Sequence, residues 1–165
     1  MKQIFFVCAV LIISSTALVN NAFAQNAQNA QMATEIETPV NVINSKAVRD
    51  FTKAFKQASG EAWFATDDGF VVKFKQDGVE TRADYNKKGN WLHTIRTYDE
   101  NRLPADIRHL VKSSYYDYDI LQVQEIEKPS NTFTYIVHLE GKTKLINLRI
   151  SDEEMEEWQK FDKSK

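Results

Sequence analysis

The chain has 165 residues, with 21 basic and 23 acidic side chains, three histidines and one cysteine. The charges of both signs are interspersed, which argues against nucleic acid or an anionic membrane surface as the partner. Cys8, the only cysteine, lies near the start of the chain. If this part is removed, the mature chain has no disulfide, no thiol nucleophile and no thiolate metal ligand.

Residues 1–24 are typical of a secretory signal peptide. Lys2 gives a positive start, an apolar run follows, and Ala-Phe-Ala before Gln25 is a small-residue cleavage site. The apolar run is short for a membrane span and is not followed by a basic stop-transfer flank. We therefore predict an exported protein that has no integral membrane segment after removal of the signal.

Residues 25–44 begin as a Gln/Asn/Ala-rich tract and pass through Pro39 without a sustained apolar period. This composition predicts a flexible linker, with a short edge strand around residues 40–43 as an alternative. Residues 45–165 are long enough to form one domain with its own core.

Helical spacing of apolar residues predicts three helices in this domain. The first begins with Ser45 as its cap and ends before Gly60, and the second begins near Pro104. Residues 151–163 start with a Ser-x-x-Glu capping box and carry acids early and lysines late, which predicts the third helix.

Strand patterns occupy most of the remaining domain. The seven predicted strands lie within residues 61–68, 69–78, 79–86, 90–98, 119–128, 132–140 and 142–150. Asp77-Gly78 is a strong hairpin signal between the second and third of them. One helix followed by several strands occurs twice, in residues 45–100 and 101–165, so we predict an α+β, two-layer fold of tandem repeats with an antiparallel sheet and its helices on one face.

The stretch DYNKKGNW, residues 84–91, resembles a calcium loop at only some positions. Asp84, Asn86 and Gly89 match, but Lys88 and Ile95 stand where oxygen ligands are needed. The stretch therefore predicts a hairpin loop, with glycine supplying a positive φ.

The strand after this loop has two amphipathic faces. Trp91, His93 and Ile95 alternate with residues that include Arg96 and Tyr98. The first set favours the core, so we predict that the second set faces outward. The predicted outward surface, which is also the candidate protein-binding site, consists of Lys73, Lys75, Arg82, Asp84, Arg96, Tyr98 and His138.

Catalytic and metal motifs are not found in the sequence. His93, His109 and His138 lie on three predicted elements without metal-site spacing. No serine has a nucleophile-elbow context, and no glycine-rich loop could cradle a phosphate. We therefore expect no cofactor and no enzymatic activity, and a hydrolase that uses dispersed carboxylates ranks last among the alternatives.

Three short motifs resemble those of a family of small exported bacterial proteins, described as PepSY-like or β-lactamase-inhibitor-like (BLIP-like). The motifs fall at Tyr85, Gly89 and Trp91, then Leu103, Pro104 and Ile107, then Tyr115, Tyr118 and Ile120. The resemblance covers roughly residues 45–151. It implies a BLIP-like fold in the periplasm or on the cell surface of a Gram-negative bacterium, and it supplies no catalytic set. It does not imply inhibition of a β-lactamase.

Our leading hypothesis from the sequence is a non-catalytic exported domain that binds an unidentified protein, an enzyme that it restrains being one candidate, through an open sheet face. The alternative is a periplasmic carrier or sensor that holds a small molecule between sheet and helices, in a pocket around Trp91. The oligomeric state is not indicated by the sequence.

Overall fold

The computed structural model describes residues 36–152 and 154–164. The predicted signal peptide and the first part of the predicted linker lie outside the described residues. Within the described residues, no helix is long and apolar enough to cross a membrane.

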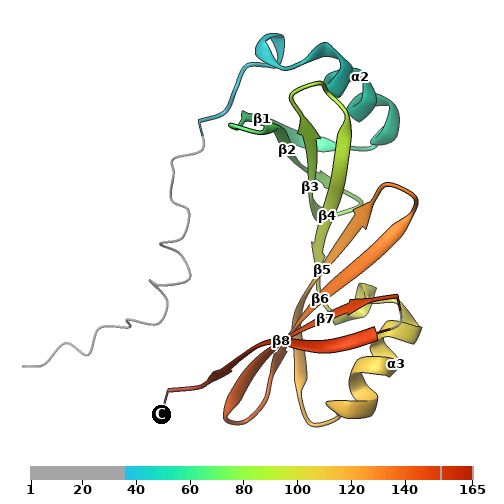
Figure 1. The fold of residues 1–165 in the computed structure, drawn as a ribbon, viewed down its shortest axis with the longest axis vertical. Coiled ribbons are helices and arrows are strands. Elements are labelled where there is room, and N and C mark those ends of the chain that lie inside the picture. Colours follow the sequence, from blue (N-terminus) through green and yellow to red (C-terminus); the bar gives the residue numbers. More distant parts are fainter. Residues whose placement is uncertain (1–35, 153, 165) are drawn as a thin grey trace, which may run out of the picture. The chain divides into compact units, whose positions relative to one another are not determined.

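The described chain forms one antiparallel sheet whose eight strands follow each other in sequence order (Figure 1). The strands are β1 (Ser59–Ala65), β2 (Gly69–Gln76), β3 (Val79–Asn86), β4 (Trp91–Tyr98), β5 (Asp119–Lys128), β6 (Thr132–Glu140), β7 (Lys144–Ser151) and β8 (Glu154–Asp162). The helices are η1 (Val40–Val42) and α2 (Ser45–Ala54) before β1, and η2 (Glu100–Arg102) and α3 (Ala105–Ser114) before β5. The predicted antiparallel sheet is confirmed, with eight strands in place of seven, and two of the three predicted α-helices are present.

The same order of elements occurs twice, with an offset of 60 residues. A 3₁₀ helix, an α-helix and a first strand begin at residues 40, 45 and 59, and again at residues 100, 105 and 119. Ile43 and Leu103 end the two 3₁₀ helices and are both buried. The shared order of elements therefore begins with η1 and η2, rather than at residue 45.

The linker predicted over residues 25–44 is too long at its C-terminal end. The Thr38 N–H donates to Trp63 O at 2.6 Å, and the Ala65 N–H donates to Thr38 Oγ1 at 2.9 Å. Ile43 is buried, and the edge strand considered for residues 40–43 is a 3₁₀ helix. This segment is fixed because it supplies hydrogen-bond partners to β1 and an apolar side chain to the core.

The third predicted helix is wrong: most of that segment forms β8. Ser151 and Glu154, read as a capping box, instead form the first residue pair of the β7–β8 hairpin. Asp152 has φ 52°, which allows the chain to reverse there. Pairing with β8 satisfies the backbone N–H and C=O groups along the outer edge of β7. A separate C-terminal helix would leave these groups unpaired, so the tertiary context overrides the local helical signal.

The first core cluster is dominated by aromatic rings. It contains Ile43, Ala47, Phe51, Trp63, Val72, Phe74, Ala83 and Tyr85. The Phe51 ring of α2 makes edge contacts with Trp63 and Phe74, at centroid distances of 5.4 and 5.0 Å. Ring pairs of this geometry contribute beyond the area they bury, so these rings attach α2 to the first strands.

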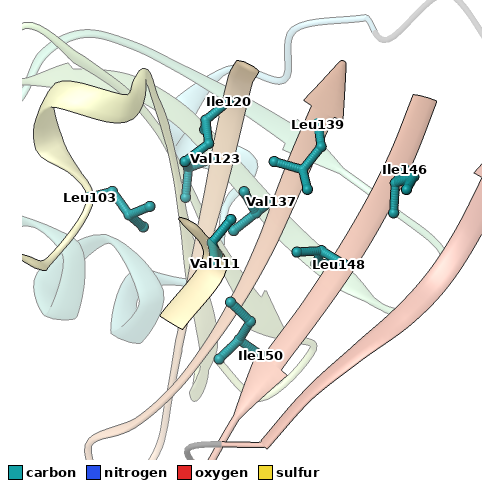
Figure 2. Packing of buried hydrophobic residues seen from close by; sticks show 9 residues of the cluster. All are labelled: Leu103, Val111, Ile120, Val123, Val137, Leu139, Ile146, Leu148 and Ile150. Carbon is teal, nitrogen blue, oxygen red and sulfur yellow. The ribbon is translucent and has the colours of Figure 1, made fainter. Parts of the chain in front are cut away.

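The second core cluster is aliphatic (Figure 2). It contains Leu103, Val111, Ile120, Val123, Val137, Leu139, Ile146, Leu148 and Ile150. In Figure 2, Val111 of α3 lies close to Val137 and Leu148 of the sheet. Their complete burial makes this cluster the apolar attachment of α3 to β5–β7.

Strand register places both clusters on one face of the sheet. Ala83 of the first cluster is paired with Thr94, and Tyr98 on the same strand is paired with Val123 of the second cluster. Directly paired residues share a face, as do residues an even number apart on a regular strand. We call the face that carries the two clusters the helix-side face, and the other the open face.

Candidate functional site

The structure divides the seven predicted surface residues between the two faces. Register places five of them on the open face: Lys73, Lys75, Arg82, Asp84 and His138. Arg96 and Tyr98 lie on the helix-side face. The prediction that these two face outward with the others is therefore wrong, whereas a binding role for any of the seven stays a prediction.

A β-bulge explains the error. Tyr85 is paired with Trp91, and the preceding Asp84 is paired with His93, so Leu92 is an extra residue in β4. An extra residue breaks the alternation of faces. Trp91 packs against the first core cluster while His93 lies on the open face, and the residues after the bulge take the faces opposite to those expected.

A charged group occupies the open face over β3 and β4. Arg82 donates to both carboxylate oxygens of Asp84, at 2.8 and 2.6 Å, and His93 Nε2 lies 3.4 Å from Asp84 Oδ2. Asp84 is only 8% exposed. Bidentate pairing of this kind fixes the guanidinium in one orientation, so the Arg82 side chain is already ordered on the open face.

The other two predicted cations of this half are also held by neighbours. Lys73 Nζ lies 5.2 Å from the centre of the Phe64 ring, and Lys75 Nζ forms an ion pair of 2.9 Å with Glu80. The Lys75 pair is well exposed and contributes little to stability.

A polar ladder crosses the open face over β6, β7 and β8. His138 Nδ1 lies 2.7 Å from Asn147 Oδ1, and Asn147 Nδ2 donates to Gln159 Oε1 at 2.8 Å. Because the amide oxygen can only accept, its contact implies that Nδ1 carries the proton in the neutral ring. His138 Nε2 is buried and has no hydrogen-bond partner among the described residues.

Three isoleucines lie between these two polar groups. Ile95 is paired with Ile126 across β4 and β5, and Ile136 is a diagonal neighbour on β6. Ile95 and Ile126 are partly exposed and Ile136 is buried. The open face therefore has an apolar centre, which we call the isoleucine centre, flanked by charges on one side and amides on the other.

On the helix-side face, charged residues fill the middle of the sheet, where β4 meets β5. Arg96 donates from Nη1 to Glu125 at 2.9 Å and from Nη2 to Glu127 at 2.7 Å. The Tyr98 hydroxyl donates to the other oxygen of Glu125 at 2.7 Å. We call these four residues the seam cluster, because they link the two groups of four strands.

Burial and charge shift the acidity of two seam residues. Burial raises the pKa of the Tyr98 phenol, and the hydrogen bond to Glu125 raises it further. Burial lowers the pKa of Arg96, but the hydrogen bonds and negative charges of Glu127 and Glu125 outweigh this effect, so the pKa of Arg96 is raised. Tyr98 is therefore a neutral hydrogen-bond donor and Arg96 a permanent cation at physiological pH.

A pocket of about 220 Å³ adjoins the seam cluster. Its lining residues are Gln76, Asp77, Val79, Thr81, Arg96, Tyr98 and Arg102. The pocket expected around Trp91 is not this one: the Trp91 indole packs against the first core cluster and donates to Thr94 Oγ1 at 3.0 Å.

Sequence reasoning missed three open-face residues. Alternation alone predicts His93 in the core, because it does not reveal the bulge, and the predicted third helix includes Gln159. Asn147 had a usable signal, since it alternates with the buried Ile146 and Leu148. In the described part of the chain, no three His, Cys, Asp or Glu side chains converge in a way that could hold a metal ion.

Solved structures share this fold at low sequence identity. A BLIP-like protein from Bacteroides fragilis is 20% identical with a TM-score of 0.60, covering 73% of this chain and 86% of that one. A DUF2874 family protein from Bacteroides ovatus is 17% identical with a TM-score of 0.60, covering 73% and 87%. A protein from Bacteroides eggerthii, described as a "putative periplasmic" protein, is 14% identical with a TM-score of 0.59, covering 73% and 88%.

No protein with curated annotation matches the chain. The profile of one protein family does match, over residues 68–152, and its description is "Putative beta-lactamase-inhibitor-like, PepSY-like". The match extends from the start of β2 to the end of β7 and so includes the whole seam between the two groups of strands. The chain belongs to this PepSY-like, β-lactamase-inhibitor-like family.

Proposed function

We propose that this chain is an exported, non-catalytic domain that binds a protein through the open face of its sheet. The observation that carries the proposal is the isoleucine centre, which lies between an ordered charged group and a polar ladder. An apolar centre with a polar rim is the usual anatomy of a protein–protein interface. The family's inhibitor-like description makes a periplasmic enzyme the class of partner to test first.

The ordered side chains around the centre support this proposal. Arg82 is held by Asp84, and Asn147 is held between His138 and Gln159. A side chain that is already ordered loses less conformational entropy when a partner binds. Arginine is also among the residues most often found at the energetic centre of interfaces.

The carrier hypothesis receives less support. Residues of both core clusters are almost completely buried, so the described helices pack directly onto the sheet. The pocket at the seam, about 220 Å³, is smaller than the 300–1,000 Å³ typical of drug-sized ligand sites. A large ligand between sheet and helices is therefore not the function we propose.

The test is recovery of a partner from periplasmic extract by the tagged chain and by two variants. Ile126→Lys places a cation in the isoleucine centre, and Tyr116→Lys makes a matched change at an exposed loop residue after α3. We expect the first variant to lose the partner and the second to retain it, with both variants showing native circular dichroism. Equal recovery by both variants would contradict the open-face site.

A further inference from the structure

We propose that the pocket beside the seam cluster binds a small carboxylate anion, at a site separate from the open face. The pocket lies on the helix-side face, between the β2–β3 hairpin, the end of β4 and η2. Its lining includes two guanidinium groups, from Arg96 and Arg102, and one carboxylate, from Asp77. Because Glu125 and Glu127 pair with Arg96, Arg102 is the lining cation that has no ion pair among the described residues.

Arg102 is the main anion-binding group. Its Nη2 donates to Asp77 O at 3.0 Å, and the guanidinium has no other hydrogen bond among the described residues. This contact fixes the guanidinium against the β2–β3 turn and leaves Nε and Nη1 available. A guanidinium can bind both oxygens of a carboxylate through two parallel N–H donors.

Two further donors line the same pocket. Arg96 uses Nη1 and Nη2 for the seam cluster, so its Nε–H remains for a ligand. The Gln76 side chain has no hydrogen bond among the described residues, and its amide can donate. Three donor side chains around one pocket suit an acceptor-only ligand, which a carboxylate is.

Apart from the Asp77 carboxylate, the remaining lining side chains are uncharged. The Tyr98 hydroxyl donates its proton to Glu125, and because its pKa is raised the phenol stays neutral. Thr81 Oγ1 donates to Val79 O at 3.1 Å, and both of these lining residues are buried. Glu125 and Glu127 are not among the lining residues, and each forms an ion pair with Arg96.

The volume limits the ligand to a small acid. A pocket of about 220 Å³ is below the size of typical cofactor sites, so a nucleotide does not fit within it. A short mono- or dicarboxylate fits, with one carboxylate on Arg102. Because Arg102 is exposed, we expect weak binding that falls as the salt concentration rises.

The experiment titrates the ¹⁵N-labelled full chain with succinate at constant ionic strength and follows the Nε–Hε signals of arginine and the backbone signals of residues 76–81 by NMR. We expect saturable shifts with succinate and none with the neutral analogue succinamide. Arg102→Gln should weaken succinate binding at least tenfold. Arg49→Gln, an identical charge change on the exposed side of α2, should leave it unchanged.

Three outcomes would overturn the proposal: no saturable shift with succinate in the unmodified chain, equal weakening in the Arg49→Gln control, or tighter binding of inorganic phosphate at the same residues. Ile126→Lys, which alters the open face, should bind succinate as the unmodified chain does. Loss of succinate binding in that folded variant would show that the two sites are not separate, and would also count against the proposal.

Discussion

The two groups of four strands share an order of elements and differ in the chemistry of their cores. In the first, rings of Phe51, Trp63 and Phe74 hold α2 to the sheet. In the second, Val111 of α3 packs among valine, leucine and isoleucine side chains (Figure 2). The same backbone arrangement therefore forms around either an aromatic or an aliphatic core. This is expected if the total core volume and the apolar pattern matter more than the identity of each residue.

The seam between the two groups is chemically different from both. Charged groups replace apolar ones at Arg96, Glu125 and Glu127, although these residues lie on the same face as the two cores. The three charged side chains are paired with one another, as charged groups in a partly buried position need to be. The seam therefore joins the two groups of strands through ion pairs, whereas each group holds its helix through apolar contacts.

The largest expected effect comes from removing the ring that joins α2 to the sheet. Phe51→Ala should lower the free energy of unfolding by about 3–5 kcal/mol, because it leaves a cavity and loses the ring contacts. Val111→Ala, at the corresponding position of α3, removes less volume and should cost about 2 kcal/mol. Urea unfolding measures both. Equal losses would mean that the two helix attachments contribute equally to stability despite their different chemistry.

A smaller loss is expected when the seam cluster loses its cation. Arg96→Ala leaves the carboxylates of Glu125 and Glu127 facing each other without a counterion, and should cost about 2–3 kcal/mol. The triple neutral variant with Glu125→Gln and Glu127→Gln added should recover part of this loss. If Arg96→Ala unfolds at the same urea concentration as the unmodified chain, the cluster does not stabilise the seam.

Two hairpin glycines provide a matched comparison between a crowded turn and an open one. Gly89 and Gly78 have φ 75° and 76°, but a Cβ on Gly89 would lie 2.7 Å from Asn44 Oδ1, whereas one on Gly78 meets nothing within 4 Å. Gly78→Ala should cost about 1 kcal/mol from backbone strain alone. Gly89→Ala should cost about 2 kcal/mol by the same principle with the clash added. Thermal unfolding of both variants tests whether the β3–β4 turn is fixed against α2.

The smallest expected effect is a pH dependence. The pKa of Tyr98 is raised in the folded state, so its contribution to stability is present below the unfolded value of about 10 and is lost as the pH rises above it. The free energy of unfolding should therefore decrease above pH ~10, and less steeply in Tyr98→Phe. At neutral pH this variant should cost about 1 kcal/mol, for the lost hydrogen bond to Glu125. Tyr116→Phe, at an exposed tyrosine, is the control. If the free energy of unfolding falls with pH as steeply in Tyr98→Phe as in this control, other groups cause the pH dependence.

Much of the fold could be predicted from local signals. Asp77 and Gly78 form the expected two-residue turn and both have positive φ. Gly89 supplies the positive φ expected of the next hairpin. These predictions succeeded because turn chemistry depends on a few neighbouring residues. Helix α2 begins at Ser45, the predicted cap, and Asn44 is the N-cap in its place.

The larger errors of prediction concern interactions between segments rather than local signals. β8 forms because β7 offers a free edge, which a local capping pattern does not reveal. The site prediction failed at Arg96 and Tyr98 because a single unpaired residue, Leu92, lies upstream of them. The seam cluster itself requires the pairing of β4 with β5, residues about 30 positions apart, and alternation within one strand contains no information about it.

Because Leu92 is an extra residue in β4, the number of residues in this strand decides which side chains lie on each face of the sheet. The shortening of β4 by this one position would exchange Ile95 with Arg96 across the sheet, and the guanidinium would lose its two carboxylates while an isoleucine took its place opposite them. Point substitutions can alter a contact on either surface, but they leave the assignment of side chains to surfaces intact. Within this protein, an insertion or deletion at that position is therefore a more radical change than any replacement of a single side chain.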